Sequence, residues 1–181
     1  MGQDGFVSER GESAVVVPVP EVEPQVFRLR DRFDSSAALG MPAHVTVLYP
    51  FLPALSLTAA VLDELRELCG RLVAFEVEFA RTGRFPGVLY LDPKPADPFR
   101  ELTRAIAKRW PEAPPYRGVH EDVVPHLTVA CAEDSTLDAV EMELVSRLPC
   151  AALLKAARLY VFDGRRWQPY EELPFRARPG R

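Results

Sequence analysis

The stretch Pro42-Ala-His-Val-Thr-Val-Leu-Tyr49 places a histidine and a threonine two residues apart in a largely apolar run. The same pattern returns at Val124-Pro-His-Leu-Thr-Val-Ala130, with His126 lying 82 positions after His44. The whole chain has only three histidines, so two of them belong to this repeated arrangement. The alternation of side chains in both stretches is typical of half-buried β-strands.

The elements on either side of the two stretches follow one another in the same order. The first half predicts a strand at 13–19, a helix ending near 34, the first His-x-Thr strand, a helix capped by Thr58 and a strand at 74–84. The second half predicts a strand at 88–91, a helix with Asp97 as N-cap, the second His-x-Thr strand, a helix at 135–148 and a strand at 151–162. A last extended piece follows at 167–175. We interpret this order as an ancient duplication.

The repeat predicts one bilobal domain of the α+β class. We expect it to span residues 13–175, with lobes at about 13–84 and 87–175. Two lobes related by an approximate two-fold axis would place their sheets around a central cleft. Residues 1–12 are expected to be disordered, and residues 176–181 form a basic tail.

The composition is that of a globular protein. Among 181 residues, 48% are hydrophobic and 27% are charged, and no apolar run approaches the roughly 20 residues of a membrane span. The polar start lacks the apolar core of a signal peptide, so we expect a cytoplasmic protein without membrane contact. Cys69, Cys131 and Cys150 include no Cys-x-x-Cys pair and lie in apolar segments, which predicts buried free thiols.

The net charge of −4 argues against binding of long duplex nucleic acid, which normally requires a basic surface. A small cyclic nucleotide or a single RNA end remains compatible with this charge. We expect the protein to act as a monomer. The sequence shows no cluster of metal ligands, so we expect neither a metal nor another cofactor.

The repeated motif suits acid–base chemistry at phosphorus. Residues i and i+2 of a strand share a face, so His44 and Thr46 point to one side, and His126 and Thr128 do the same in the second lobe. Imidazoles titrate near neutral pH, so one can accept a proton from water while the other donates to the leaving oxygen. The hydroxyls can donate hydrogen bonds to non-bridging phosphate oxygens. A structural role is the ordinary fate of a single strand histidine, but chance accounts poorly for two equivalent motifs.

At these residues the chain resembles the 2H phosphoesterase superfamily, which is named for two His-x-Thr-x motifs. His44-Val-Thr-Val47 and His126-Leu-Thr-Val129 match both motifs, and the similarity extends from about Ser13 to about Phe175. The chain is most similar to the 2′-5′ RNA ligase-like branch, also called RNA 2′,3′-cyclic phosphodiesterases.

The resemblance implies a LigT-like fold, in which two pseudo-symmetric antiparallel sheets line a cleft and helices lie outside. It also implies metal-independent action on a 2′,3′-cyclic phosphate or a 2′-5′ linkage. By the same resemblance His44 is the general acid, His126 is the general base, and Thr46 and Thr128 bind phosphate. One departure concerns Ala130-Cys131-Ala132, because many members carry a basic residue just after the second motif.

Further candidates lie near the motifs in sequence. Arg117 and Arg84 are candidate phosphate contacts, since a guanidinium pairs well with phosphate oxygens. Phe85 and Tyr116 are candidates for stacking on a base. Tyr49 is expected to pack in the core, on the face of its strand opposite His44. The polar residues His120, Glu121 and Asp122 are expected to be solvated.

Two other functions stay open at this point. The scaffold could serve as a non-catalytic module that binds a nucleotide or an RNA end. Alternatively, the chain could be a 2′-5′ RNA ligase, which runs the same chemistry in reverse. Hydrolysis is preferred, because both threonines that would hold the phosphate are intact.

Overall fold

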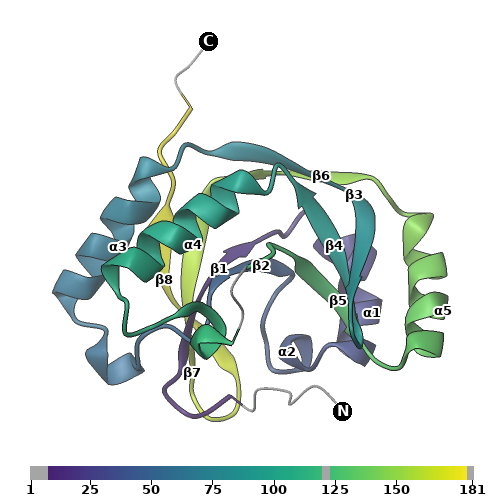
Figure 1. The fold of residues 1–181 in the computed structure, drawn as a ribbon, viewed down its shortest axis with the longest axis horizontal. Helices are drawn as coiled ribbons and strands as arrows, with labels where there is room; N and C mark the ends of the chain where they lie inside the picture. The colour runs from purple at the N-terminus through teal and green to yellow at the C-terminus, as the bar shows by residue number, and fades with distance from the viewer. Residues whose placement is uncertain (1–7, 120–122, 179–181) are drawn as a thin grey trace.

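The fold contains two antiparallel sheets of four strands each (Figure 1). The computed structural model describes residues 8–119 and 123–178. The first sheet has the spatial order β2-β1-β7-β8 and comprises β1 Ser13–Pro18, β2 His44–Leu48, β7 Ala156–Phe162 and β8 Trp167–Pro174. The second sheet has the order β5-β4-β3-β6 and comprises β3 Phe75–Phe85, β4 Val88–Lys94, β5 Leu127–Cys131 and β6 Cys150–Leu154.

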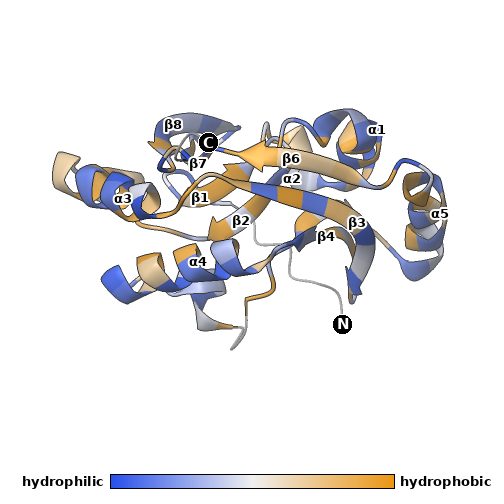
Figure 2. Ribbon diagram, turned by 90° about the horizontal axis from the view of Figure 1, so that it is seen from above, coloured by the Kyte–Doolittle hydropathy of each residue, from blue (hydrophilic) through white to orange (hydrophobic). Residues whose placement is uncertain are grey.

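Helices cover the outer faces of both sheets. The α-helices are α1 Glu23–Phe33, α2 Ser35–Ala38, α3 Ala59–Arg71, α4 Asp97–Arg109 and α5 Asp134–Val145, and the 3-10 helices are η1 Ala54–Ser56 and η2 Pro115–Gly118. Helices α3 and α4 contact strands of the first sheet, whereas α1 and α5 contact the second sheet. Figure 2 shows hydrophilic and hydrophobic residues alternating along α3 and α4, as expected of helices with one buried side. The predicted α+β class with antiparallel sheets and outer helices is confirmed.

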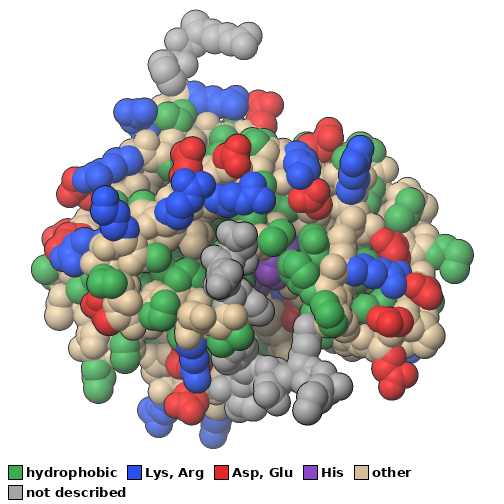
Figure 3. Space-filling view, viewed as in Figure 1, with side chains coloured by type: hydrophobic (Ala, Val, Ile, Leu, Met, Phe, Trp, Pro, Cys, Tyr) green, Lys and Arg blue, Asp and Glu red, His purple; other side chains and the backbone are tan. Residues whose placement is uncertain are grey.

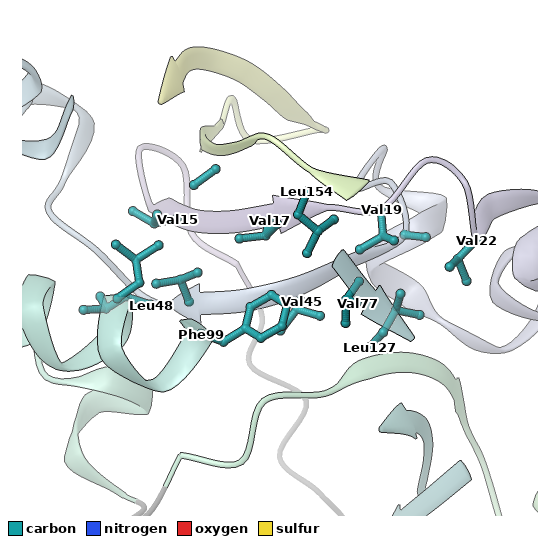
Figure 4. Packing of buried hydrophobic residues seen from close by; sticks show 14 of the residues in the cluster. Val15, Val17, Val19, Val22, Val45, Leu48, Val77, Phe99, Leu127 and Leu154 are labelled. Carbon is teal, nitrogen blue, oxygen red and sulfur yellow. The ribbon is translucent and has the colours of Figure 1, made fainter. Parts of the chain in front are cut away.

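A continuous hydrophobic core joins the two sheets to the helices. Val15 and Val17 of β1 and Val45 of β2 are fully buried and pack with Phe99 of α4 and Leu127 of β5 (Figure 4). Burying each such side chain contributes about 1.5–3 kcal/mol to folding. The β-branched valines favour the extended backbone at these positions. This core fixes how β2 and β5 lie, and these are the strands that carry the two motifs.

The two sheets do not correspond to two contiguous halves of the chain. Strand β3 pairs with β4 in the second sheet, while β7 and β8 return to the first sheet. The expected single strand at 151–162 is in fact two strands, because the chain leaves the second sheet after Leu154 and enters the first at Ala156. Lobes cut at residues 84 and 87 therefore divide the sequence but not the sheets. Apolar alternation continues across the break, so the pattern gave no sign of it.

Both ends of the predicted domain extend further than expected. Gly11 N–H donates to the Phe162 carbonyl at 2.8 Å, and Phe162 N–H donates to the Glu12 carbonyl at 2.8 Å. Residues 8–12 are therefore tied to β7, and the expectation of disorder through residue 12 is wrong there. In the tail, Arg176 N–H donates to the Leu72 carbonyl at 2.8 Å, and its carbonyl accepts from Ala74 N–H at 2.9 Å.

The helix starts agree with the sequence in one case of two. Thr58 caps α3, because its hydroxyl accepts a hydrogen bond from Val61 N–H at 3.3 Å. The prediction for α4 was wrong by one residue: Asp97 is the first helical residue, Ala96 is the N-cap, and Pro98 follows at the second position. No helix among the described residues is long and apolar enough to cross a membrane.

The cysteines are unpaired, and two of the three are buried. Cys69 and Cys150 lie in the interior as expected, but Cys131 is exposed at the end of β5, so that part of the prediction was wrong. Cys131 is the last residue of its strand, where the apolar pattern no longer reports burial. Residues 8–119 and 123–178 contain no group of three or more His, Cys, Asp and Glu side chains that could hold a metal ion.

Candidate active site

The two His-x-Thr motifs lie on adjacent strands, one from each sheet. Strands β2 and β5 are in contact, although they belong to different sheets. In β2, Val45 and Val47 are buried, while His44 and Thr46 on the other face are half-buried. Strand β5 repeats the pattern, with Leu127 and Val129 buried and Thr128 half-buried. The strand alternation read from the sequence therefore holds in both motifs.

The two imidazoles share one hollow. They are close enough that the positive charge of protonated His126 would lower the pKa of His44. Figure 3 shows a hollow near the middle of one face, with a histidine side chain at its floor and Lys and Arg side chains along its upper rim. The surroundings thus combine titratable groups near the floor with cations at the edge.

Each imidazole is anchored in the same way. His44 Nδ1 lies 2.7 Å from the carbonyl oxygen of Pro42, and His126 Nδ1 lies 2.7 Å from that of Val124. A carbonyl can only accept, so Nδ1 carries the proton in both rings and donates it. In the neutral form Nε2 is then left as the acceptor. The carbonyl two residues before each histidine therefore fixes the tautomer and leaves Nε2 for chemistry.

The protein keeps both rings neutral in the absence of a ligand. Burial, followed by the charge of Arg30, lowers the pKa of His44 to about 4, although the bond to Pro42 and the charge of Asp34 act in the opposite direction. Burial also lowers the pKa of His126, and its bond to Val124 opposes this. Either ring can accept a proton at neutral pH. A ring that serves as an acid has to gain its proton when an anion enters the site.

An ion cluster on α1 holds the segment that precedes His44. The side chain of Arg30 is only 1% exposed, its Nε donates to Asp34 at 3.1 Å, and its Nη2 donates to the Met41 carbonyl at 3.2 Å. Glu23 accepts a hydrogen bond from Ala43 N–H at 2.6 Å. Sequence reasoning missed this cluster. The available signal was an arginine one residue after Leu29 on the buried side of an amphipathic helix, a position where arginine is seldom found without a partner.

Tyr116 reaches the site through its hydroxyl. Its side chain is half-buried, and the hydroxyl is hydrogen-bonded to Thr46 of the first motif. The neighbouring Arg117 turns the other way, and its Nη2 donates to Glu12 at 2.6 Å. Both residues come from η2, which the sequence placed only as a loop near the site. Tyr116 is thus at the first motif, whereas Arg117 stands half-exposed beside the N-terminal segment.

Phe85 lies against the second histidine. Its ring centroid is 5.1 Å from that of His126 in an edge-on arrangement, and it stacks on Tyr90 at 4.5 Å. Tyr90 lies 5.4 Å from His126, so the three rings form one cluster. Sequence reasoning missed Tyr90. Its place follows from the register, because it pairs with Thr128 on one side and with Gly83 on the other.

The structure does not bring Arg84 to this site. Its guanidinium pairs with Asp138 at 2.8 Å and also with Glu141, both on α5. Arg84 pairs across the strands with the buried Leu89, so it faces the helix side of the second sheet while Phe85 faces the imidazole. Adjacent strand residues point to opposite faces, and only one of these two neighbours could reach the site. His120, Glu121 and Asp122 lie outside the described residues.

Tyr49 is packed as expected but on the other face of the first sheet. It lies against a second apolar cluster that includes Val16 and Trp167, with its ring 5.9 Å from the Trp167 ring. Val16 pairs with Thr46, so this cluster is on the side of the site. A register shift between Val15 and Val16 inserts one extra residue into β2. This bulge reverses the alternation that had predicted the opposite face.

Comparison with known proteins identifies the family to which this arrangement is related. The model of the 2′-5′ RNA ligase superfamily matches residues 18–166, which is most of the chain and includes both motifs. No curated protein matches the sequence.

Solved structures of low sequence identity share the fold. The structure of Escherichia coli LigT complexed with 3′-AMP is 18% identical, with a TM-score of 0.59, and the match covers 92% of this chain and 99% of LigT. Protein TT0787 of Thermus thermophilus is also 18% identical, with a TM-score of 0.61 and coverage of 92% and 98%. A structure described as a phosphoesterase is 17% identical, with a TM-score of 0.58 and coverage of 93% and 99%. The LigT-like fold expected from the motifs is therefore confirmed.

Proposed function

The chain belongs to the 2′-5′ RNA ligase superfamily, and we propose that it is a metal-independent phosphodiesterase. Its proposed substrates are 2′,3′-cyclic phosphates, or 2′-5′ phosphodiesters, of RNA ends or nucleotides. The observation that carries this proposal is the matched anchoring of His44 and His126, whose Nδ1 atoms each donate to a carbonyl at 2.7 Å. Two Nε2 atoms fixed in this way provide an acceptor and a donor for one displacement at phosphorus.

In the proposed reaction, one oxygen bond to phosphorus forms as another breaks. Water attacks phosphorus and gives a proton to Nε2 of His126, the general base. The bond from phosphorus to the ribose oxygen breaks, and that oxygen takes a proton from Nε2 of His44, the general acid. The charge of Arg30 opposes protonation of His44 in the free protein. The anionic substrate would offset this charge, so His44 becomes an acid only when the site is occupied.

The two threonines would stabilise the charge that develops on phosphate. Thr46 and Thr128 share faces with the histidines of their motifs, so their hydroxyls can donate to the non-bridging oxygens. Each positioned acid or base typically contributes about 10²–10⁴-fold to the rate. We expect loss of one threonine hydroxyl to reduce turnover less than loss of an imidazole.

The surroundings are consistent with a nucleotide rather than phosphate alone. LigT of Escherichia coli has been crystallised with 3′-AMP, NADP⁺ and ATP. In the present chain the Phe85 ring borders His126, and we propose that it packs against the base or ribose of the substrate. Arg117 would contact phosphate only if its ion pair with Glu12 opened. Arg84 is not included in the proposed site.

A panel of substrates tests this function. The purified protein would be incubated with 2′,3′-cyclic mononucleotides, RNA ending in a cyclic phosphate, 2′-5′ dinucleotides and ADP-ribose cyclic phosphate, with and without EDTA. We expect turnover that EDTA leaves unchanged and that falls at least about 10²-fold in H44A and in H126A. T46V and T128V keep the side-chain shape and test the hydroxyls separately. Full activity in both histidine variants would overturn the proposal.

The same panel separates the alternatives. A binding module would retain a cyclic nucleotide tightly and yield no product after long incubation. A ligase would join 2′,3′-cyclic and 5′-hydroxyl RNA ends into a 2′-5′ linkage faster than it hydrolyses that linkage.

A further inference from the structure

The turn that carries Tyr116 has an unusual backbone. Among the residues that the structure describes, Tyr116 and Arg117 are the two non-glycine residues with positive φ, at 50° and 55°, and Gly118 follows at 76°. Residues with a side chain seldom adopt this left-handed conformation, and two in succession are rarer still. Such a turn persists only when its surroundings hold it, and strain of this kind often occurs at functional sites.

The contacts that hold this turn come from two other segments. Tyr116 N–H donates to the Tyr49 carbonyl, just after β2, at 2.6 Å. Arg117 pairs with one carboxylate oxygen of Glu12, and the Tyr49 hydroxyl donates to the other at 2.8 Å. The turn is therefore braced against the end of the first motif strand and against the N-terminal segment. This bracing fixes the point from which the Tyr116 side chain enters the site.

The hydroxyl of Tyr116 stays protonated throughout the working pH range. Burial raises the pKa of Tyr116 to about 12, while the bond with Thr46 acts in the opposite direction. Two hydroxyls joined by one hydrogen bond use one of their two protons between them. The other proton remains available for an acceptor in the site. Tyr116 and Thr46 can therefore form a unit that accepts no net charge and donates outward.

The sequence around the second motif leaves a role for such a unit. The residues after it are Ala130-Cys131-Ala132, without the basic side chain that the resemblance led us to expect. Arg117 is engaged by Glu12 and Arg84 by α5, so neither candidate cation points to the motifs. A neutral donor at the first motif would bind phosphate by hydrogen bonds instead of by an ion pair.

We propose that Tyr116 and Thr46 act as one donor unit for the substrate phosphate, with Tyr116 as the positioning residue that directs the Thr46 hydroxyl. The proposal rests on the proposed function, since it assigns the phosphate to the first motif. It replaces the expectation that Tyr116 stacks on a base. The hydroxyl of Tyr116, and not its ring, is then the part that the reaction requires.

A double-mutant cycle of Y116F and T46V tests this unit. We expect each single variant to weaken binding of inorganic phosphate by about 10- to 100-fold, because each removes a hydrogen bond that supports a charged group. The double variant should be no weaker than the worse single variant, since both changes disable the same donor. Phosphate binding would be measured by calorimetry and cyclic-nucleotide turnover by steady-state kinetics. Y170F is the matched control, because Tyr170 is 49% exposed on β8.

The outcomes distinguish this inference from the function on which it depends. Wild-type-like phosphate binding in a folded Y116F, or losses in the two single variants that simply multiply in the double variant, would overturn the unit even if the enzyme is active. An unchanged melting temperature in Y116F would confirm that binding, and not folding, was lost. If the wild type hydrolyses no phosphodiester, the calorimetric cycle still decides whether the unit binds phosphate. Absence of phosphate binding by the wild type would also overturn it.

Discussion

Gly83 offers a sharp test of how the second sheet shapes the site, because the ring of Tyr90 lies directly over it. A Cβ added at Gly83 would stand 2.4 Å from Cζ of Tyr90 and 2.5 Å from its hydroxyl oxygen. Carbon atoms in favourable contact are about 3.5–4.0 Å apart, so in G83A the ring has to move by at least about 1 Å. Since the Tyr90 ring packs beside His126, this movement reaches the imidazole.

The expected cost affects both stability and turnover. Overpacking of this kind costs about 1–3 kcal/mol of unfolding free energy. For a chain of this size each kcal/mol lowers the melting temperature by about 2–4 °C. A displacement of about 1 Å near reacting groups can reduce turnover by about 10²-fold. We therefore expect G83A to fold, to melt several degrees lower, and to lose about 10- to 100-fold in kcat on a cyclic nucleotide.

Two matched variants show whether the clash is the cause. Gly70 is in α3 and has nothing within 4 Å of an added Cβ, so G70A should keep activity and gain up to about 1 kcal/mol of stability. In a Y90L background the obstructing ring is absent, and adding G83A should then cost much less. Thermal melts and initial rates would be measured for all four proteins. A G83A protein with normal melting and normal turnover would refute the placement of Tyr90 over Gly83.

The remaining predictions concern charge. In R30M the pKa of His44 should rise from about 4 toward its ordinary value, as followed by NMR titration, while stability falls by about 3–5 kcal/mol because Asp34 loses its buried partner; R30M/D34N should recover part of that loss, and an unmoved His44 would contradict the reasoning. The lowered pKa of His44 means that the unfolded chain gains a proton between pH 6.5 and about 4 that the folded protein refuses, so unfolding free energy should decrease as pH falls through this range and decrease less in H44Q. R84M should leave kcat and KM unchanged, because its partners are on α5; a rise in KM would place this arginine at the substrate.

The sequence predicted the site where strand alternation alone determines direction. His44, Thr46 and Thr128 lie where a period of two puts them, because apolar neighbours pin each strand to the core. The same rule failed at Tyr49, where a bulge adds one residue to β2. Local pattern carries no record of a register shift, which depends on the partner strand.

Contacts between distant segments could not be predicted either. Arg30 is buried beside the strand that carries His44 only because α1 packs across the segment at 41–43, and helical periodicity shows a buried side without showing what it meets. The exchange of strands between the halves has the same origin. Strand β3 pairs with β4 through the turn at Gly87, whose φ of 73° suits a tight reversal. The order of elements was correct, but the assignment of strands to sheets required the tertiary structure.

The central claim is that His44 and His126 serve one phosphate, and a crystal structure of the protein soaked in inorganic phosphate or vanadate tests it most directly. We predict one anion with Nε2 of both imidazoles within hydrogen-bond distance, about 2.6–3.2 Å, and with the hydroxyls of Thr46 and Thr128 beside it. An anion bound elsewhere, or one that touches a single imidazole while the other faces away, would contradict the claim.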